Sequence, residues 1–383
     1  MMKFSGRIFS FILSALCVHG VMISGNNDMI YAQGNNKYIV GYLPDWSYGY
    51  YKDMDFTDLT HINIAFCNPD TSGNLSCYIP DAEMKKIVDK AHENGVKVLA
   101  SLGGAGGSGN YPALVRDEKT RNDFCEKIID FCEKYNLDGI DLDIEGEVEA
   151  SFWDYYDQWC LYLRKRCDEK GYLLTTASAR WIARRVSDTA FSYFDFINVM
   201  AYDNDGSKVS HAGYDFSTEM LDYFNITRGI EKDRLVLGVP FYGRGYNPDG
   251  SLSWTSYVPF SELVEQDREN YDRDEYNGIA YNGAETMKKK CDLADDYAGI
   301  MIWEVTQDAK GEYSLLDLIK KELTDSVAVK GDINSDGKCD ISDLVQLMKY
   351  LTSQNILQNE CMDINEDDKI NIADICLLKE MLL

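Results

Sequence analysis

Eight short runs of mostly apolar residues recur between residues 38 and 303, and longer amphipathic stretches separate them. The runs are 38–42, 61–66, 97–102, 139–145, 173–177, 196–202, 235–241 and 299–303. Between them, stretches such as 81–94, 118–135 and 152–171 have the helical period, and 314–323 forms a closing helix that Ser314 would cap. This alternation predicts a (β/α)8 TIM barrel. The rival, an open doubly wound sheet, usually begins with a glycine-rich phosphate turn, and residues 103–107 lack the spacing of one.

An acidic row lies on the fourth run. Alternate side chains of a strand face opposite sides, so Asp141, Asp143 and Glu145 share one face. Such carboxylates repel one another, so the row must be solvent-exposed, metal-bound or catalytic. In a barrel, active sites lie where the strands end, and the sixth and eighth runs end at Tyr202 and Trp303. This convergence favours the catalytic interpretation.

The charge and the first residues restrict location and partners. A formal net charge of -26 argues against nucleic acid and anionic membrane surfaces as partners. Residues 1–32 have the features of a signal peptide, because Lys3 and Arg7 precede an apolar stretch and Ala32 is a plausible cleavage end. A retained membrane anchor is the alternative, and polar interruptions disfavour it. We therefore expect a secreted, extracellular protein without a membrane span after signal removal.

The cysteines do not form a zinc or thioredoxin-like pattern, since no C-x-x-C occurs. Cys67 and Cys77 flank a turn-rich segment and could close it with a disulfide, although spacing alone does not fix the pairing. Two further pairs are seven residues apart on predicted helices, about 10 Å along the axis and too far to bridge. These are Cys125 with Cys132 and Cys160 with Cys167, which we expect to be buried thiols.

Two acidic loops follow residue 331. Each has oxygen-bearing side chains at the first, third, fifth, ninth and twelfth places of a calcium loop, and the seventh place supplies a backbone carbonyl. The predicted ligands are Asp332, Asn334, Asp336, Lys338, Asp340 and Asp343, then Asp363, Asn365, Asp367, Lys369, Asn371 and Asp374. Each loop runs into an apolar helix, 344–351 or 375–382. The duplication predicts a small all-α module with two EF-hand-like loops and two Ca²⁺ ions.

The stretch 138–145 resembles the D-x-x-D-x-D-x-E signature of family 18 glycoside hydrolases, the chitinase family. Further matches follow in the order of the predicted strands: Gly-Tyr at 41–42, Ser-Leu-Gly-Gly at 101–104 and Met-Ala-Tyr-Asp at 200–203. Gly-Val-Pro-Phe-Tyr-Gly-Arg at 238–244 and Gly-Ile-Met-Ile-Trp at 299–303 complete the set. As an ordered set these motifs are highly specific, although each alone would not be.

The resemblance implies a retaining, substrate-assisted glycosidase that needs no cofactor for catalysis, which fits the absence of an obvious second nucleophile in the sequence. Glu145 would be the acid, and its negative neighbours would keep it protonated near neutral pH. Asp143 would orient the acetamido group of the substrate, Asp141 would share a proton with Asp143, and Tyr202 would donate a hydrogen bond to the acetamido oxygen. The expected substrate contacts are Trp303 as the aromatic floor, with Met200, Asp203, Arg244, Tyr42 and Gly104.

The second module resembles a dockerin, because both calcium loops end in Asp and no helix precedes the first. We therefore expect a signal peptide at 1–32, a chitinase-like catalytic domain at 33–325 and a dockerin domain at 331–383. A dockerin implies a cohesin partner on a cellulosome-type scaffold, and hence a location at the cell surface or in such an assembly.

The resemblance implies that the substrate is chitin or another glycan that contains N-acetylglucosamine, and the expected activity is that of an endo-chitinase. An endo-β-N-acetylglucosaminidase that releases N-glycans and a non-catalytic chitin-binding relative are the alternatives.

Many chitinases of this family insert a sizeable subdomain after the seventh strand. Here only about 247–282 is available, so we expect a shallow cleft with Trp254 and Tyr257 at its edge.

Overall fold

The computed structural model describes residues 37–146, 148–206, 210–324, 330–334, 339–352, 360–365, 367 and 369–382. The predicted signal peptide at 1–32 lies outside these residues. Within the described part of the chain, no helix is long and apolar enough to cross a membrane.

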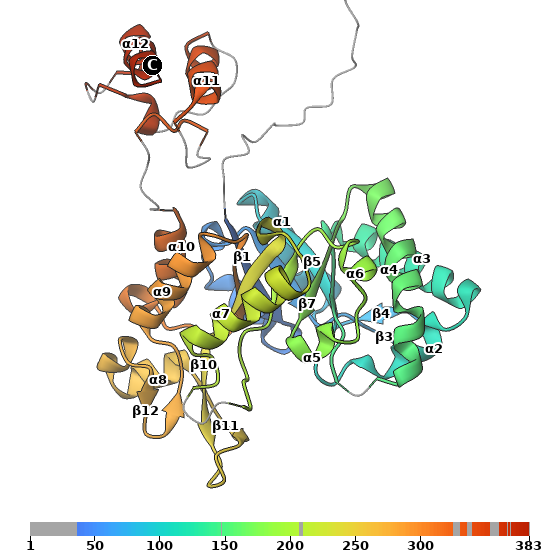
Figure 1. Ribbon diagram of the computed structural model, residues 1–383. Helices are drawn as coiled ribbons and strands as arrows, with labels where there is room; N and C mark the ends of the chain where they lie inside the picture. Colours follow the sequence, from blue (N-terminus) through green and yellow to red (C-terminus); the bar gives the residue numbers. More distant parts are fainter. Residues whose placement is uncertain are drawn as a thin grey trace, which may run out of the picture.

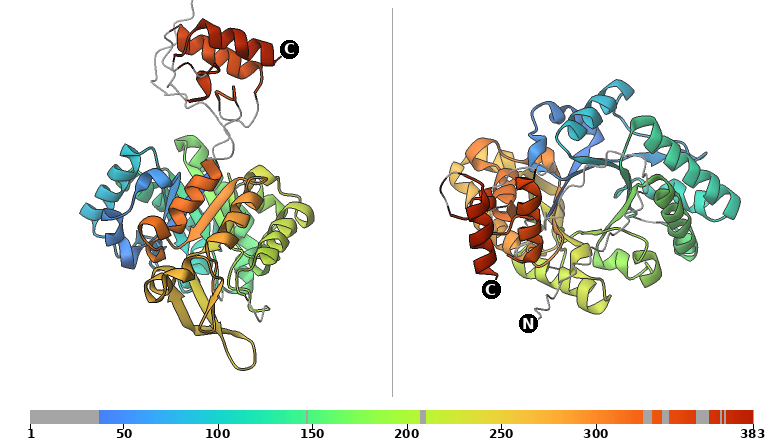
Figure 2. Two further views of the ribbon diagram at one scale, coloured as in Figure 1. Left: turned by 90° about the vertical axis from the view of Figure 1, so that its left-hand side faces the viewer. Right: turned by 90° about the horizontal axis from the view of Figure 1, so that it is seen from above.

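A closed barrel of eight parallel strands confirms the predicted fold (Figures 1 and 2). Its order is β1-β14-β9-β8-β7-β6-β5-β2, in which chain neighbours pair and β1 closes the ring against β14. The strands are β1 (Tyr38–Pro44), β2 (His61–Ala65), β5 (Lys97–Gly103), β6 (Gly139–Asp143), β7 (Leu173–Ser178), β8 (Ile197–Val199), β9 (Leu235–Pro240) and β14 (Gly299–Trp303). All eight predicted runs are present. Strand β6 ends two residues earlier than predicted, which leaves Glu145 just beyond its end.

Helices surround the barrel and bury their apolar stripes against it (Figure 2, right). They are α1 (Asp81–Glu93), α2 (Tyr111–Val115), α3 (Glu118–Tyr135), α4 (Trp153–Lys170), α5 (Arg180–Ala183), α6 (Asp188–Phe191), α7 (Tyr214–Asp222), α9 (Ala284–Ala294) and α10 (Leu315–Thr324). Helix α3 has the predicted bounds because Asp117 caps its first turn and Asn136 ends it in a left-handed conformation. Ser314 caps α10 as predicted, since its Oγ accepts from the Asp317 amide at 3.0 Å.

Two small sheets lie outside the barrel. A short hairpin of β3 (Asn68–Pro69) and β4 (Leu75–Ser76) follows β2. After β9, the sheet β11-β10-β13-β12 forms from β10 (Tyr242–Tyr246), β11 (Leu252–Pro259), β12 (Glu275–Tyr276) and β13 (Ile279–Ala280), with α8 (Phe260–Gln266) beside it. The insertion expected to be too short for a domain therefore folds as a four-stranded sheet with one helix. The sheet begins at Tyr242, five residues before the predicted start of the insertion at 247, so more residues are available to form it than expected.

The predicted helical cysteines are buried. Cys125, Cys132, Cys160 and Cys167 are all buried free thiols on α3 and α4, as expected.

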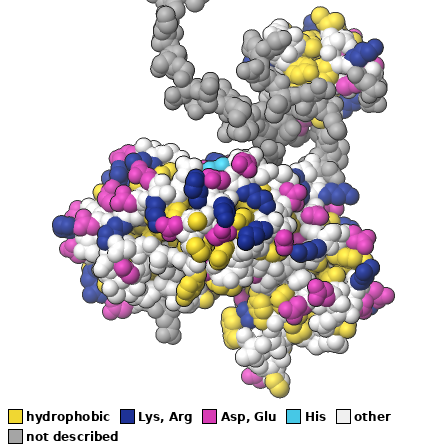
Figure 3. All heavy atoms as spheres, turned by 180° about the vertical axis from the view of Figure 1, so that it is seen from behind, with side chains coloured by type: hydrophobic (Ala, Val, Ile, Leu, Met, Phe, Trp, Pro, Cys, Tyr) yellow, Lys and Arg dark blue, Asp and Glu magenta, His cyan; other side chains and the backbone are white. Residues whose placement is uncertain are grey.

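On the face shown in Figure 3, Lys and Arg side chains are interspersed with Asp and Glu.

The last described residues form a separate small core around Ile333, Leu347, Ile364 and Leu378. Two helices cover it, α11 (Ile341–Leu351) and α12 (Ile372–Met381). Both begin three residues earlier than predicted, because Asp340 and Asn371 each start a capping box in which both side chains of the box bond to the backbone. The two halves therefore repeat in structure as they do in sequence.

Gly299 makes the closure of the barrel possible. Its φ of +138° lies in the region that glycine favours, and a Cβ there would overlap the backbone carbonyl of Tyr38 on β1. Because the obstacle is backbone in a paired strand, it cannot move aside without breaking the β1–β14 ladder.

We predict that Gly299→Ala destabilises the barrel by more than about 3 kcal/mol, since it adds a backbone clash to an unfavourable φ. The matched control is Gly95→Ala, because Gly95 also has a positive φ of +74° but has nothing within 4 Å of an added Cβ. The control should cost only about 1–2 kcal/mol. Denaturant unfolding measures both, and equal losses of stability would contradict the assignment of Gly299 to barrel closure.

Candidate active site

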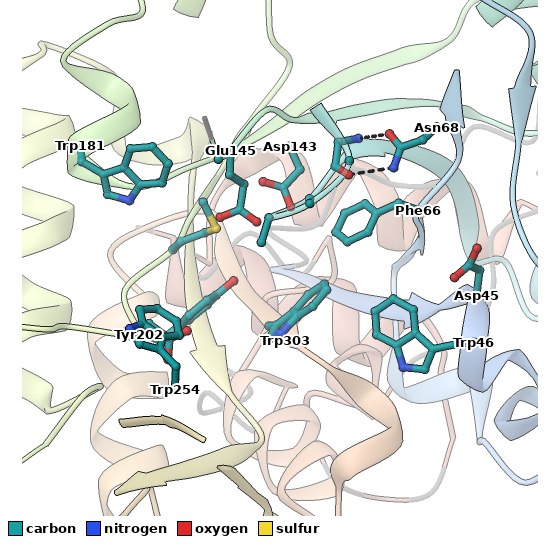
Figure 4. Close-up of a pocket in the computed structure, with 18 of the residues that line it drawn as sticks. Asp45, Trp46, Phe66, Asn68, Asp143, Glu145, Trp181, Tyr202, Trp254 and Trp303 are labelled. Carbon is teal, nitrogen blue, oxygen red and sulfur yellow. Dashed lines mark hydrogen bonds between the residues drawn. The ribbon is translucent and has the colours of Figure 1, made fainter. Parts of the chain in front are cut away.

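A cleft of about 1350 Å³ opens at the carboxyl ends of the barrel strands (Figure 4). Eight of the ten predicted catalytic and substrate-binding residues line it: Gly104, Asp143, Glu145, Met200, Tyr202, Asp203, Arg244 and Trp303. The other two, Asp141 and Tyr42, are buried and are not part of the lining. The topology explains this convergence, because every parallel strand of a barrel ends on the same face.

Asp141 lies in the barrel interior and is completely buried. Its carboxylate accepts hydrogen bonds from Tyr42 Oη at 2.7 Å, Ser101 Oγ at 2.8 Å and Thr175 Oγ1 at 2.7 Å, and a longer one from Asn198 Nδ2 at 3.3 Å. Burial raises the pKa of Asp141, and these donors oppose that rise. Tyr42, expected as a substrate contact, therefore points its hydroxyl at Asp141.

Asp143 occupies the next position of the row and is buried with few compensating contacts. Its Oδ1 has no hydrogen-bond partner among the described residues. Burial raises the pKa of Asp143 well above its usual value, and the charges of Glu145 and Asp141 raise it further. Asp143 therefore favours the protonated form, and it carries a polar atom without a partner among the described residues next to the cleft.

Glu145 lies just beyond β6 with its carboxyl group in the cleft (Figure 4). Burial raises the pKa of Glu145 to about 7, and the negative charge of Asp203 contributes to that rise. A carboxyl group with this pKa is poised to give and take a proton near neutral pH.

Asp203 is held as an anion by a polar cluster. Its carboxylate accepts hydrogen bonds from Tyr242 Oη at 3.0 Å and from two nitrogens of Arg244, Nε at 3.1 Å and Nη2 at 3.0 Å. The buried ring of His211 also lies 3.3 Å from Asp203 Oδ1 through Nδ1. Burial alone would raise the pKa of Asp203, but the hydrogen bonds from His211 and Arg244 lower it below its usual value. The cluster thus keeps a negative charge beside Glu145.

Aromatic rings form the floor and flanks of the cleft. Trp303 packs against Phe66 with ring centroids 5.7 Å apart and meets Tyr42 edge-on at 5.5 Å. Tyr202 lies beside it, and burial raises the pKa of its hydroxyl well above the usual value, so Tyr202 remains a hydrogen-bond donor. Gly104 must be glycine, because its φ is +78° and a Cβ would overlap the ring of Phe66.

Several residues that line the cleft or support it were not predicted from the sequence. His211 and Tyr242 support Asp203 from a loop and from the inserted sheet, and Trp46 and Trp181 are exposed on opposite sides of the cleft (Figure 4). Asn68 bonds both backbone groups of Gly103. An exposed tryptophan just after a predicted strand was a usable signal for Trp46 and Trp181, whereas the sequence gave no signal for His211.

Trp254 lines the cleft as expected, and Tyr257 instead donates to Gln307 at 2.7 Å.

The described parts of the two predicted calcium loops have the same internal hydrogen bonds. Asp343 and Asp374 are fully buried, and each accepts hydrogen bonds from the amides at the second, third and ninth places of its loop. Asp336 and Lys338 lie outside the described residues. Among the residues that are described, no three His, Cys, Asp or Glu side chains are grouped closely enough to hold a metal ion. The oxygen donors and the buried twelfth-place carboxylates suit Ca²⁺.

Comparison with known proteins agrees with this geometry. The family description "Glycosyl hydrolases family 18" matches residues 38–308, and "Dockerin type I domain" matches residues 330–383. The chain is 25% identical over 354 residues to "Probable chitinase 2" of Drosophila melanogaster, which covers 72% of each protein.

Solved structures are also similar. The GH18 chitinase ChiB from the chitin utilization locus of Flavobacterium johnsoniae is 33% identical, with a TM-score of 0.68 over 76% of this chain and 94% of that one. A chitinase from Bacteroides thetaiotaomicron is 29% identical, with a TM-score of 0.68 over 76% and 97%. The chain therefore belongs to family 18 of the glycosyl hydrolases and carries a dockerin type I domain at its carboxyl end.

Proposed function

We propose that this enzyme is a chitinase that hydrolyses β-1,4 linkages next to N-acetylglucosamine with help from the substrate's own acetamido group. The observation that carries the proposal is the arrangement of three carboxyl groups in the cleft. Glu145 has a pKa of about 7, burial and neighbouring charges raise the pKa of Asp143 well above its usual value, and Asp203 remains ionised. Asp143 Oδ1 also lacks a hydrogen-bond partner among the described residues. Chitinases among the similar proteins support the choice of substrate.

In this mechanism, Glu145 gives its proton to the glycosidic oxygen as that bond breaks. The acetamido carbonyl oxygen of the sugar whose glycosidic bond breaks attacks the anomeric carbon of that sugar, so no second protein nucleophile is needed. Asp143, whose Oδ1 has no hydrogen-bond partner among the described residues, bonds and orients the acetamido group, and the charge of Asp141 raises the pKa of Asp143. Glu145 then takes a proton from the water that opens the ring intermediate, which restores the original anomer.

The aromatic residues would bind the sugar rings. Trp303 lies at the centre of the cleft, where an apolar sugar face can stack on it. Tyr202 would donate to the acetamido oxygen, and Met200, Arg244 and Gly104 would complete the wall. A non-catalytic relative is disfavoured because Glu145 is present and its pKa suits proton transfer. Release of N-glycans uses the same chemistry and remains the second candidate.

The carboxyl-terminal module would place the enzyme on a scaffold. A dockerin of this type suggests a calcium-dependent partnership with a cohesin module, outside the cell, after removal of the signal peptide at 1–32. We assign two Ca²⁺ ions to the loops at 332–343 and 363–374. The catalytic domain at 33–325 and the dockerin at 331–383 would then act as separate units.

The proposed reaction predicts the identity of the first product. Chitotetraose should be cleaved with retention of the β anomer, and the fully deacetylated tetramer should not be cleaved, because it lacks the acetamido nucleophile. Proton NMR of the freshly formed product measures the anomer, and a high-mannose glycoprotein assayed in parallel separates chitinase from glycan-releasing activity.

Two variants control the assay. Glu145→Gln should lower turnover by about 100- to 10,000-fold, because the amide cannot deliver a proton. Glu149→Gln should keep the turnover, because Glu149 is exposed and its contacts, an ion pair with surface Arg116 and a hydrogen bond from Ser151 Oγ at 3.3 Å, lie at the surface. An initial α anomer, or equal cleavage of the deacetylated substrate, would refute the substrate-assisted mechanism.

The dockerin should depend on calcium for its stability. Without the ion, buried Asp343 and Asp374 lie among further acidic side chains of their loops, and ion binding at 100 times Kd adds about 2.7 kcal/mol per site. Calorimetry of the full chain should show one transition that chelator lowers and calcium restores, and a barrel transition that chelator leaves in place. Asp343→Asn combined with Asp374→Asn should abolish the calcium effect. A thermogram that chelator leaves unaltered would disprove the calcium assignment.

A further inference from the structure

The base of the β3–β4 hairpin brings two cysteines together. In this antiparallel pair Asn68 faces Ser76, so the residues next in register, Cys67 and Cys77, face each other. The thiol of Cys67 donates to the Ile64 carbonyl at 3.8 Å, and each of the two thiols shifts the pKa of the other. Side chains directly opposite in an antiparallel pair have Cβ atoms about 4.5–5.5 Å apart, which is near the separation that a disulfide requires.

The two thiols differ in exposure and in acidity. Cys67 is completely buried, whereas Cys77 is half-buried and lines the cleft. The neighbouring Cys67 thiol lowers the pKa of Cys77, and the Cys77 thiol together with burial raises the pKa of Cys67 well above its usual value. Cys77 is therefore the reachable thiol that ionises first, and thiolates are the species that react with disulfides.

We propose that Cys67 and Cys77 form a dithiol site that reacts with small-molecule disulfides and closes into an intramolecular disulfide. The Cys77 thiolate attacks one sulfur of the reagent, forms a mixed disulfide and releases one small thiolate. Cys67 then loses its proton and attacks Cys77 Sγ, which releases the second small thiol. The protein loses two electrons and two protons, and the reagent gains them as two thiols.

The hairpin that this bond would close is a wall of the cleft. Asn68 holds Gly103 through two hydrogen bonds, Nδ2 to the Gly103 carbonyl at 2.9 Å and the Gly103 amide to Oδ1 at 2.8 Å. The next amide, that of Gly104, donates to the Asp143 carbonyl at 2.7 Å. A disulfide between Cys67 and Cys77 would thus fix the base of the segment that supports the backbone of Asp143.

Buried cysteines elsewhere provide the contrast. Cys125, Cys132, Cys160 and Cys167 lie inside α3 and α4 and are buried, so a dissolved reagent cannot reach them in the folded chain. Cys291 on α9 is also buried and serves as a control position. A reagent that attacks the folded barrel should therefore select the hairpin pair.

The test incubates the folded full chain with oxidised and reduced glutathione, blocks the remaining thiols and maps the peptides by mass spectrometry. We expect two fewer free thiols in the barrel and one cross-linked peptide that joins Cys67 to Cys77. Cys67→Ser should stop at a glutathione adduct on Cys77, because the resolving thiol is gone. The control Cys291→Ser should still form the cross-link. Closing this short loop should raise the melting temperature of the barrel by about 5 °C.

Recovery of both hairpin cysteines as free thiols under oxidising glutathione would overturn the proposal, and so would a cross-link that joins either of them to another cysteine. A cross-linked protein whose barrel melts at the same temperature as the reduced protein would overturn the claim that the bond braces the hairpin. None of these outcomes depends on the substrate, so the proposal stands or falls separately from the proposed function.

Discussion

The burial of carboxyl groups along β6 is the constraint on which the site depends. Each charge placed there is costly, and the structure treats the groups differently. Asp141 receives hydrogen bonds from four side chains of the barrel interior, whereas Asp143 has an oxygen without a partner among the described residues. Because Asp141 receives more hydrogen bonds than Asp143, its ionised form is better stabilised than that of Asp143. This difference between neighbouring carboxyl groups is what makes the row useful for proton transfer.

The charge on Asp203 completes this arrangement. It comes from a different strand end and is neutralised on its outer side by Arg244, so its field reaches Glu145 without leaving an unpaired charge in the protein. The inserted sheet after β9 supplies both Arg244 and Tyr242. This sheet therefore helps to hold Asp203 in place in addition to being a wall of the cleft.

Much of the fold could be predicted because barrel strands and helices follow local patterns. The helix Glu118–Tyr135 begins and ends at its capping residues, which the sequence shows directly. The acidic row could also be recognised, because three carboxylates on one face of a strand are unusual. Contacts between distant segments could not be predicted in this way. His211 reaches Asp203 across a loop, Tyr42 turns toward Asp141, and the inserted sheet begins inside a run of residues that reads as part of a strand motif. Such contacts depend on three-dimensional packing, which periodicity does not encode.

The central claim is that burial and the charge of Asp203 keep Glu145 protonated near neutral pH, and the pH dependence of kcat/KM tests it most directly. An acid must be protonated to work, so the wild-type rate should fall as pH rises through about 7. Asp203→Asn removes a negative neighbour and leaves Arg244 unpaired, which should move this alkaline limb to lower pH. Asp205→Asn, at an exposed acid of the same cleft, should leave it in place. An alkaline limb that Asp203→Asn does not move would contradict the account.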